Sequence, residues 1–198
     1  PTRFVEPDTE PLPALRAFLS AHPDAAEFVV KPAVGAGSKD AQRYARSQEF
    51  AAANHLARLL DADRSAMLQP YLPSVDDNGE TALMFFAGTY SHAIRKGPLL
   101  RPDEGPTPHL FAAEAIVARS PQADEFALAQ RVMAAAVDAL HLDEPPAYAR
   151  VDLIRDAQGL PCLLELELCE PSLFFAHAAG SAERFARVLA ETLQRVSA

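Results

Sequence analysis

Apolar side chains recur along this chain at two spacings, one typical of helices and one typical of strands. A repeat of three or four residues predicts helices over residues 48–60, 123–140 and 182–196, after a shorter helix that ends at His22. Short apolar or alternating runs predict strands over residues 27–31, 67–69, 81–87, 89–95, 149–155 and 163–168. Turn residues separate the members of the last two strand pairs, so each pair is expected to form an antiparallel hairpin.

The helices and strands do not alternate regularly, as they would in a parallel sheet, and this order predicts an α+β fold. We place a boundary after residue 66, so that residues 1–66 form a first lobe and residues 67–198 form a second lobe with both hairpins. Residues 1–13 are rich in proline and are expected to be extended.

The charge balance limits what the fold is expected to bind. The chain has 18 basic and 27 acidic side chains, a net charge of −9 and no basic cluster, which argues against a nucleic-acid partner. No apolar run approaches the roughly 20 residues that cross a bilayer, so we expect no membrane contact and a cytoplasmic location. The two cysteines, Cys162 and Cys169, cannot build a disulfide framework or a four-ligand zinc site.

A loop of small residues follows the first predicted strand and is a candidate phosphate site. Lys31 stands at the end of that strand, and Gly35, Gly37 and Ser38 follow within the loop. Backbone N–H groups in such a loop can surround a phosphate, and Lys31 would add a positive charge. The spacing matches neither a Walker loop nor a dinucleotide fingerprint, so for the loop alone a flexible turn is the stronger interpretation.

Three carboxylates on the second hairpin form a candidate metal site. Strand alternation places Glu165 and Glu167 on one face, and Asp152 can lie opposite them on the partner strand. Carboxylates converging in an apolar sheet repel one another unless a cation lies between them, and an oxygen-only ligand set suits Mg²⁺ rather than zinc. The alternative is a solvated face of an ordinary amphipathic hairpin; the flanking Arg150 favours the metal site.

The first hairpin ends in two adjacent cations, Arg95 and Lys96. Alternation directs them to opposite faces, so at most one of them can share a face with the carboxylates. Before this hairpin, residues 69–72 form an extended segment whose backbone groups could pair with the edge of an adenine, although alone it is an ordinary linker.

In this order, these motifs resemble the ATP-grasp superfamily over essentially the whole chain. The resemblance implies two α+β lobes that grip a nucleotide, with ATP and Mg²⁺ or Mn²⁺ as cofactors. It assigns the phosphate-binding lysine and lid to Lys31, Gly35, Gly37 and Ser38, and the adenine hinge to Gln69, Pro70, Tyr71 and Leu72. It assigns the ribose hydroxyls to Glu80, the metal to Asp152, Glu165 and Glu167, and the migrating phosphoryl group to Arg95 and Arg150.

Residues 85–96 and 165–174 are similar to the glutathione-synthetase-like branch, which includes O-ureido-D-serine cyclo-ligase of D-cycloserine biosynthesis. Two residues depart from common patterns. Glu167 stands where the wider superfamily has Asn, and Ala82 stands where glutathione synthetases carry a substrate-contacting Arg, which argues against a glutathione-type substrate.

The resemblance implies an ATP-dependent carboxylate–amine ligase that forms an acyl phosphate on a small amino-acid-like substrate; ring closure within one substrate is one form of this reaction. The alternative is a nucleotide-binding module that has lost catalysis and serves a partner or regulatory role. The family also implies a preceding α/β domain, without which this chain is expected to be weak or inactive and to associate into homo-oligomers. Residues 99–118 are expected to form part of the acceptor pocket.

Overall fold

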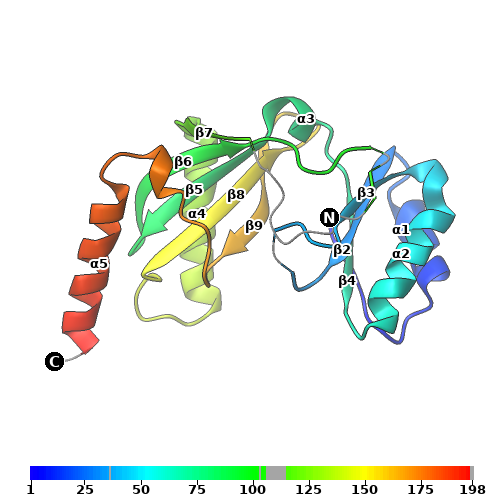
Figure 1. Cartoon of the computed structure of the whole chain (residues 1–198), viewed down its shortest axis with the longest axis horizontal. Coiled ribbons are helices and arrows are strands. Elements are labelled where there is room, and N and C mark those ends of the chain that lie inside the picture. Colours follow the sequence, from blue (N-terminus) through cyan, green and yellow to red (C-terminus); the bar gives the residue numbers. More distant parts are fainter. Residues whose placement is uncertain (36, 103, 106–114, 197–198) are drawn as a thin grey trace. The chain divides into compact units, whose positions relative to one another are not determined.

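The computed structural model describes residues 1–35, 37–102, 104–105 and 115–196. The chain divides into two compact units, Pro1–Tyr71 with Leu99–Ala113 and Leu72–Pro98 with Glu114–Ala198. Each unit has its own antiparallel sheet (Figure 1). Half of the range expected to form the acceptor pocket, residues 103 and 106–114, lies outside the described residues.

The first unit is a four-stranded sheet covered on one face by two helices (Figure 1). Its strands are β1 (Arg3–Val5), β2 (Glu27–Pro32), β3 (Gln42–Ala45) and β4 (Ala66–Pro70), in the order β1-β4-β2-β3. The helices are α1 (Pro11–Ala21) and α2 (Glu49–Asp61), with the short 3-10 turn η1 (Arg46–Gln48) before α2. Their apolar sides pack on the sheet around Leu15, Phe18, Phe28 and Leu56, all of them buried.

Two features of this unit differ from the predictions. Helix α1 begins at Pro11, inside the stretch expected to be extended, because proline is tolerated in a first helical turn, where the backbone N–H has no partner. Strand β4 begins at the expected lobe boundary and pairs with β1 and β2 in the first sheet.

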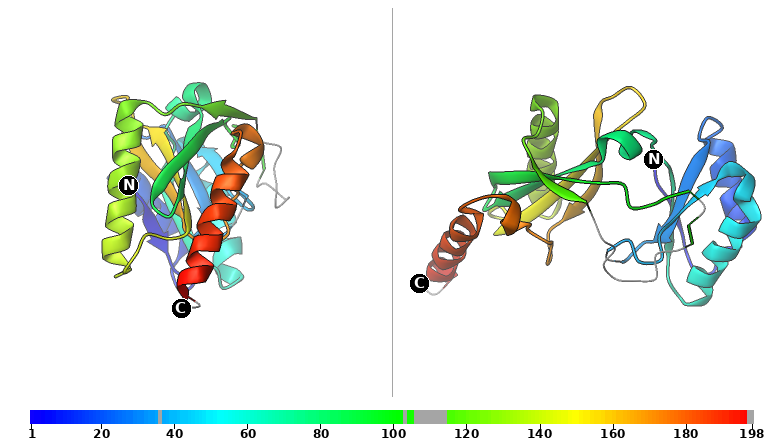
Figure 2. Two further views of the ribbon diagram at one scale, coloured as in Figure 1. Left: turned by 90° about the vertical axis from the view of Figure 1, so that its left-hand side faces the viewer. Right: turned by 45° about the horizontal axis from the view of Figure 1, so that its top comes forward.

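The second unit is a five-stranded sheet in the order β7-β6-β5-β8-β9. Its strands are β5 (Glu80–Phe86), β6 (Thr89–Lys96), β7 (Ile116–Arg119), β8 (Tyr148–Arg155) and β9 (Pro161–Glu167). Helix α4 (Ala123–Ala139) packs on one face, and α5 (Ser181–Val196) lies on the side of the other face (Figure 2). Phe185 of α5 meets that face, since its ring lies 5.1 Å from that of Phe86. Two short turns complete the unit, α3 (Ser74–Asn78) and η2 (Phe175–His177).

Both predicted hairpins are confirmed. Strands β5 and β6 are joined at Ala87 and Gly88, which have φ values of 44° and 76° and form the tight turn expected there. Strands β8 and β9 are joined around Gly159. Within the described ranges, no helix has both the length and the apolar character to cross a bilayer.

Candidate active site

The three carboxylates predicted to bind metal meet on the face of the second sheet opposite helix α4. Asp152 on β8 pairs in register with Glu165 on β9, and a bulge follows this pair. One carboxylate oxygen from each of Asp152, Glu165 and Glu167 lies within 4.8 Å of the others. Asp152 is fully buried, Glu167 is partly exposed and Glu165 is exposed, so the cluster opens to solvent on the β9 side.

Two cations of the protein itself hold the buried carboxylate. Arg150 makes a two-pronged contact with Asp152, with nitrogen–oxygen distances of 2.8 and 2.9 Å, and also donates to Glu167. Lys96 Nζ lies 2.7 Å from Asp152 and 2.9 Å from Glu80. These side chains therefore place four carboxylates beside two cations and leave two negative charges uncompensated, which a divalent cation would balance.

The pKa shifts follow from this arrangement. Burial alone would lower the pKa values of Lys96 and Arg150, but the carboxylates beside them, Asp152 above all, raise both, so the two cations stay charged. Burial raises the pKa of Glu80 and of Glu167, and Lys96 and Arg150 respectively oppose the rise.

Of the two adjacent cations on β6, only Lys96 joins this cluster. Arg95, predicted to act on the phosphoryl group, instead donates to the backbone carbonyls of Asn78 and Asp77 in α3, at 2.5 and 2.8 Å. As predicted, at most one of the pair faces the carboxylates. The structure brings Lys96 to the cluster, whereas the prediction from the sequence was Arg95. Lys96, which was not selected, lies opposite Glu80 in the strand register.

Glu80 reaches Lys96 because the residue before it is a glycine. Gly79 has φ 67°, and a Cβ built there would lie 2.2 Å from the carbonyl oxygen of Lys96. The side chain predicted to bind ribose therefore starts β5 in an ion pair at the border of the carboxylate cluster.

The residues predicted to bind phosphate and adenine lie mostly in the first unit. Lys31 is half-buried on β2, and among the described residues its ammonium has no hydrogen-bond or ion-pair partner. Gly37 and Ser38 both have positive φ, and Gly35 precedes them in the same loop.

The segment predicted to be an adenine hinge spans the end of β4 and the boundary between the units. Gln69 donates its side-chain amide to Thr2, and Pro70 ends the strand opposite Phe28. The Tyr71 N–H donates to the carbonyl of Glu27 at 2.9 Å, so this backbone donor is already used. Leu72 is the first residue of the second unit.

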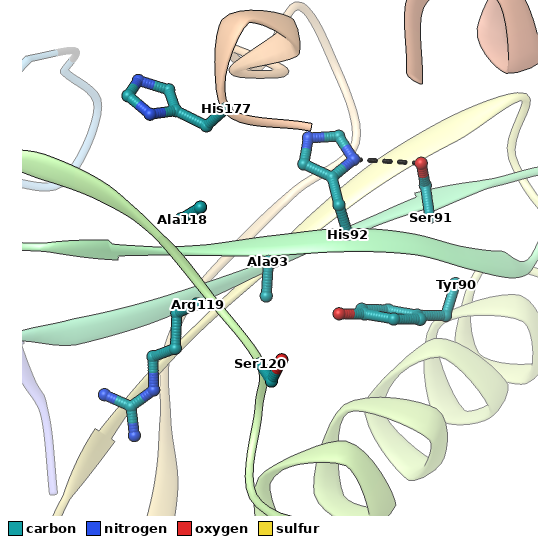
Figure 3. A pocket seen from close by; sticks show the side chains of 8 residues that line it. All are labelled: Tyr90, Ser91, His92, Ala93, Ala118, Arg119, Ser120 and His177. Atoms are coloured by element: carbon teal, nitrogen blue, oxygen red, sulfur yellow. Dashed lines mark hydrogen bonds between the residues drawn. The ribbon is translucent and has the colours of Figure 1, made fainter. Parts of the chain in front are cut away.

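A shallow open hollow of about 340 Å³ lies beside β6 and was not predicted from the sequence (Figure 3). It is lined by Tyr90, Ser91, His92, Ala93, Ala118, Arg119, Ser120 and His177. His92 connects this hollow to the cluster, because the strand register aligns it with Met84 and, one strand further, with Arg150.

Comparison with known proteins identifies one similar curated sequence and a set of similar solved structures. No family model matches the chain. It is 50% identical over 194 residues to the cycloserine biosynthesis protein DcsG of Streptomyces lavendulae, a match that covers 98% of this chain and 64% of that protein. The crystal structure of D-cycloserine synthetase DcsG matches with a TM-score of 0.90 and 49% identity, over 98% of this chain and 64% of that one.

More distant structures share the fold. D-alanine–D-alanine ligase from Bacillus anthracis, complexed with ATP, matches with a TM-score of 0.63 and 17% identity, over 99% of this chain and 60% of that one. The ATP-grasp ligase PsnB, complexed with a precursor peptide and AMPPNP, has a TM-score of 0.58 and 18% identity, over 96% of this chain and 53% of that one. The chain spans 64% of the length of its DcsG relative. The α+β fold and the resemblance expected from the sequence are confirmed: the chain has the ATP-grasp fold and is similar, over nearly all of its own length, to D-cycloserine synthetase.

Proposed function

We propose that the chain is part of an ATP-dependent carboxylate–amine ligase that works through an acyl phosphate. The observation that carries the proposal is the cluster itself, in which buried Asp152 is held by Arg150 and Lys96 beside two further carboxylates. Phosphoryl transfer asks of a protein mainly positioning and charge neutralisation, and this cluster supplies both. The 50% identity to a D-cycloserine synthetase favours a small amino-acid-like substrate, of which O-ureido-D-serine is the first to test, and a ring-closing ligation.

The donor set fits a divalent metal. Asp152, Glu165 and Glu167 would hold Mg²⁺ or Mn²⁺, because all three offer oxygen atoms and the four carboxylates of the cluster carry two more charges than its two cations balance. When bound, Mg²⁺ supplies charge neutralisation for the phosphates of ATP. In the first unit, Lys31 and the loop with Gly35, Gly37 and Ser38 would bind phosphate. Residues 69–72, where the chain passes from the first unit to the second, would bind adenine.

The proposed reaction has two steps. A carboxylate oxygen of the substrate bonds to the γ-phosphorus of ATP, while the bond to the bridging oxygen breaks and ADP leaves. An amine nitrogen then bonds to the acyl carbon and loses a proton, and phosphate leaves with the former carboxylate oxygen. Arg150 and Lys96 would stabilise the negative charge on the transferring group, so that Lys96 takes the role expected for Arg95. Glu80 would bind ribose only in competition with its ion pair to Lys96.

The competing function is a nucleotide-binding module without catalysis. A pure binder has little need for a buried Asp152 held by two cations, since these groups serve the γ-phosphate rather than the nucleoside. We therefore rank the ligase first.

Phosphate release separates these functions. The protein is incubated with ATP, Mg²⁺ and a panel of D- and L-amino-acid-like carboxylates that includes O-ureido-D-serine. The ligase predicts phosphate release that depends on one of these carboxylates, that is lost in Asp152→Asn and that persists in Asp143→Asn, which changes an exposed aspartate outside the cluster. ATP binding without carboxylate-dependent phosphate release from any member of the panel would favour the binding module.

A further inference from the structure

We propose that His92 is a positioning residue for the ligation, because its hydrogen bond to Leu173 holds the segment that follows β9 against Arg150. This inference rests on the proposed function for its catalytic consequence, but the contact itself is independent of it. None of the comparisons assigns a role to His92, to Ser91 or to Arg184.

The strand register places His92 and Arg150 in one row across the sheet. His92 pairs with Met84, and Met84 pairs with Arg150. Adjacent strands lie about 4.8 Å apart, so the two side chains stand about 10 Å apart on the same face. Glu167 continues the row on the far side of Arg150.

The segment Ser172–Phe174 bridges this gap and is held at both ends. Arg150 Nη1 donates to the carbonyl of Ser172 at 3.3 Å, and the His92 Nε2–H donates to the carbonyl of Leu173 at 2.9 Å. The ring of Phe174 lies 5.6 Å from the Arg150 guanidinium, and Phe174 has φ 49°, a conformation that a non-glycine residue keeps only when its surroundings hold it.

The hydrogen bonds also determine the state of the imidazole. Leu173 offers only an acceptor, so His92 Nε2 carries a proton. Arg184 directs two donors at Ser91 Oγ, at 3.1 and 3.3 Å, which leaves the Ser91 hydroxyl to donate to His92 Nδ1 at 2.9 Å (Figure 3). Burial lowers the pKa of His92 most, the hydrogen bond to Leu173 opposes this, and the charges of Arg184 and His177 lower the pKa further, so the net shift favours the neutral ring. The hydrogen-bond relay therefore runs from Arg184 through Ser91 and His92 to Leu173.

Ser91 occupies its place because of a bulge in β6. Met84 pairs with His92 and Phe85 pairs with Tyr90, so Ser91 is the extra residue between them. The bulge also has a second effect. It shifts the register by one residue, so that Lys96 rather than Arg95 faces Glu80. The bulge at Ser91 therefore determines both the hydrogen-bond relay that ends at Leu173 and which cation of β6 lies beside Asp152.

This arrangement predicts which kinetic constant depends on His92. Without the tie to Leu173, Phe174 is free to leave the guanidinium, and Arg150 loses a neighbour that fixes its orientation toward Asp152 and Glu167. Lys31 and the loop with Gly35, Gly37 and Ser38, which are proposed to bind phosphate directly, lie in the other unit. We therefore expect kcat to fall while the KM for ATP stays nearly constant.

The test compares four variants of the full-length protein in carboxylate-dependent phosphate release. His92→Phe fills the space without a donor, His92→Gln keeps an N–H near the Nε2 position, Ser91→Ala cuts the relay one residue earlier, and Ser120→Ala changes the same hollow outside the relay. His92→Phe is expected to lower kcat about threefold to tenfold, with the KM for ATP within about twofold. His92→Gln should recover most of this loss, Ser91→Ala should fall between, and Ser120→Ala should match the unaltered protein.

Hydrogen–deuterium exchange of residues 172–178, measured without substrate, tests the contact even if the protein releases no phosphate. Faster exchange in His92→Phe and Ser91→Ala, but not in Ser120→Ala, supports the tie. If His92→Phe does not fold, Ser91→Ala and His92→Gln carry the comparison. Unchanged exchange in these variants, or unchanged kcat in a protein that does turn over, would overturn the proposal; absent turnover with faster exchange would count against the ligase function alone.

Discussion

At the scale of single residues, Lys96 and Arg95 are neighbours in sequence with opposite surroundings. Lys96 is 6% exposed and forms ion pairs with both Asp152 and Glu80. Arg95 is partly exposed and donates hydrogen bonds to the last two backbone carbonyls of α3. Strand alternation predicted that only one of these two cations could face the carboxylates. Which of them does so depends on the register of β6, and the bulge at Ser91 shifts that register. No local pattern in the residues announces that bulge, so the sequence could not show that Lys96, rather than Arg95, joins this cluster; the role of Arg95 toward the phosphoryl group stays a prediction.

This difference predicts unequal costs of substitution. Lys96→Met leaves Glu80 without its ion pair and Asp152 with only one, so the free energy of unfolding should fall by about 3 kcal/mol. Arg95→Gln loses two contacts near the surface and should cost about 1 kcal/mol. Urea unfolding of both variants measures these values. Equal losses would show that Lys96 is no more important to the fold than its neighbour.

His55 predicts a pH dependence in the first unit. It is 2% exposed on α2, and neither ring nitrogen has a hydrogen-bond partner among the described residues. Burial, and secondarily Arg58, lowers its pKa from 6.5 to about 4. The unfolded chain therefore takes up the proton first as the pH falls, so the stability present above pH 6.5 declines down to about pH 4, by up to about 3 kcal/mol.

The control for this dependence is His55→Leu, which removes the titrating group and keeps an apolar side chain. Thermal unfolding followed across this pH range should show a smaller decline in the variant than in the unaltered protein. Superimposable pH profiles would mean that His55 titrates normally in the folded state.

At the scale of elements, the alternation of side chains and the turn residues were enough to predict both hairpins and to bring Asp152, Glu165 and Glu167 onto one face. Strands β1, β3 and β7 were not predicted. They have three or four residues each and lie at sheet edges, so backbone pairing with a neighbouring strand defines them rather than an apolar pattern of their own.

The start of β5 gives a prediction at this scale. A Cβ at Gly79 would lie 2.2 Å from the Lys96 carbonyl, so Gly79→Ala must push β5 and β6 apart, and we expect a loss of more than about 2 kcal/mol. Gly159 has a similar φ of 77° but nothing within 4 Å of the added Cβ, so Gly159→Ala should cost only about 1 kcal/mol. Chemical denaturation of the two variants provides the comparison, and a milder effect at Gly79 than at Gly159 would contradict it.

At the scale of the whole molecule, the order of motifs indicated the ATP-grasp fold more securely than any single motif did. The loop after β2 and the segment at residues 69–72 carry little information alone, because the same residues form ordinary turns and linkers. The informative feature is their order along the chain, in which both precede two hairpins and the second hairpin carries three carboxylates. The structural likeness to D-cycloserine synthetase supports the fold inferred from this order. The hollow beside His92 was beyond sequence reasoning, since it depends on η2 lying next to β6.

A bound metal should stabilise the protein measurably. A ligand at ten times its dissociation constant adds about 1.4 kcal/mol when it binds only the folded state. Mg²⁺ or Mn²⁺ at millimolar concentration should therefore raise the melting temperature, EDTA should reverse the rise, and Glu165→Gln should abolish it, whereas Asp143→Asn should retain it. A rise of the same size in Glu165→Gln would assign the metal to another place.

The acyl phosphate is the central claim, and transfer of an isotope tests it most directly. The carboxylate that best supports phosphate release is labelled with oxygen-18 in its carboxyl group, and the phosphate formed with ATP and Mg²⁺ is analysed by mass spectrometry. The proposed reaction predicts one labelled oxygen in each phosphate, because the carboxylate oxygen that bonds to phosphorus leaves with it. Phosphate released without label would contradict the account, since water rather than the carboxylate would then have attacked ATP.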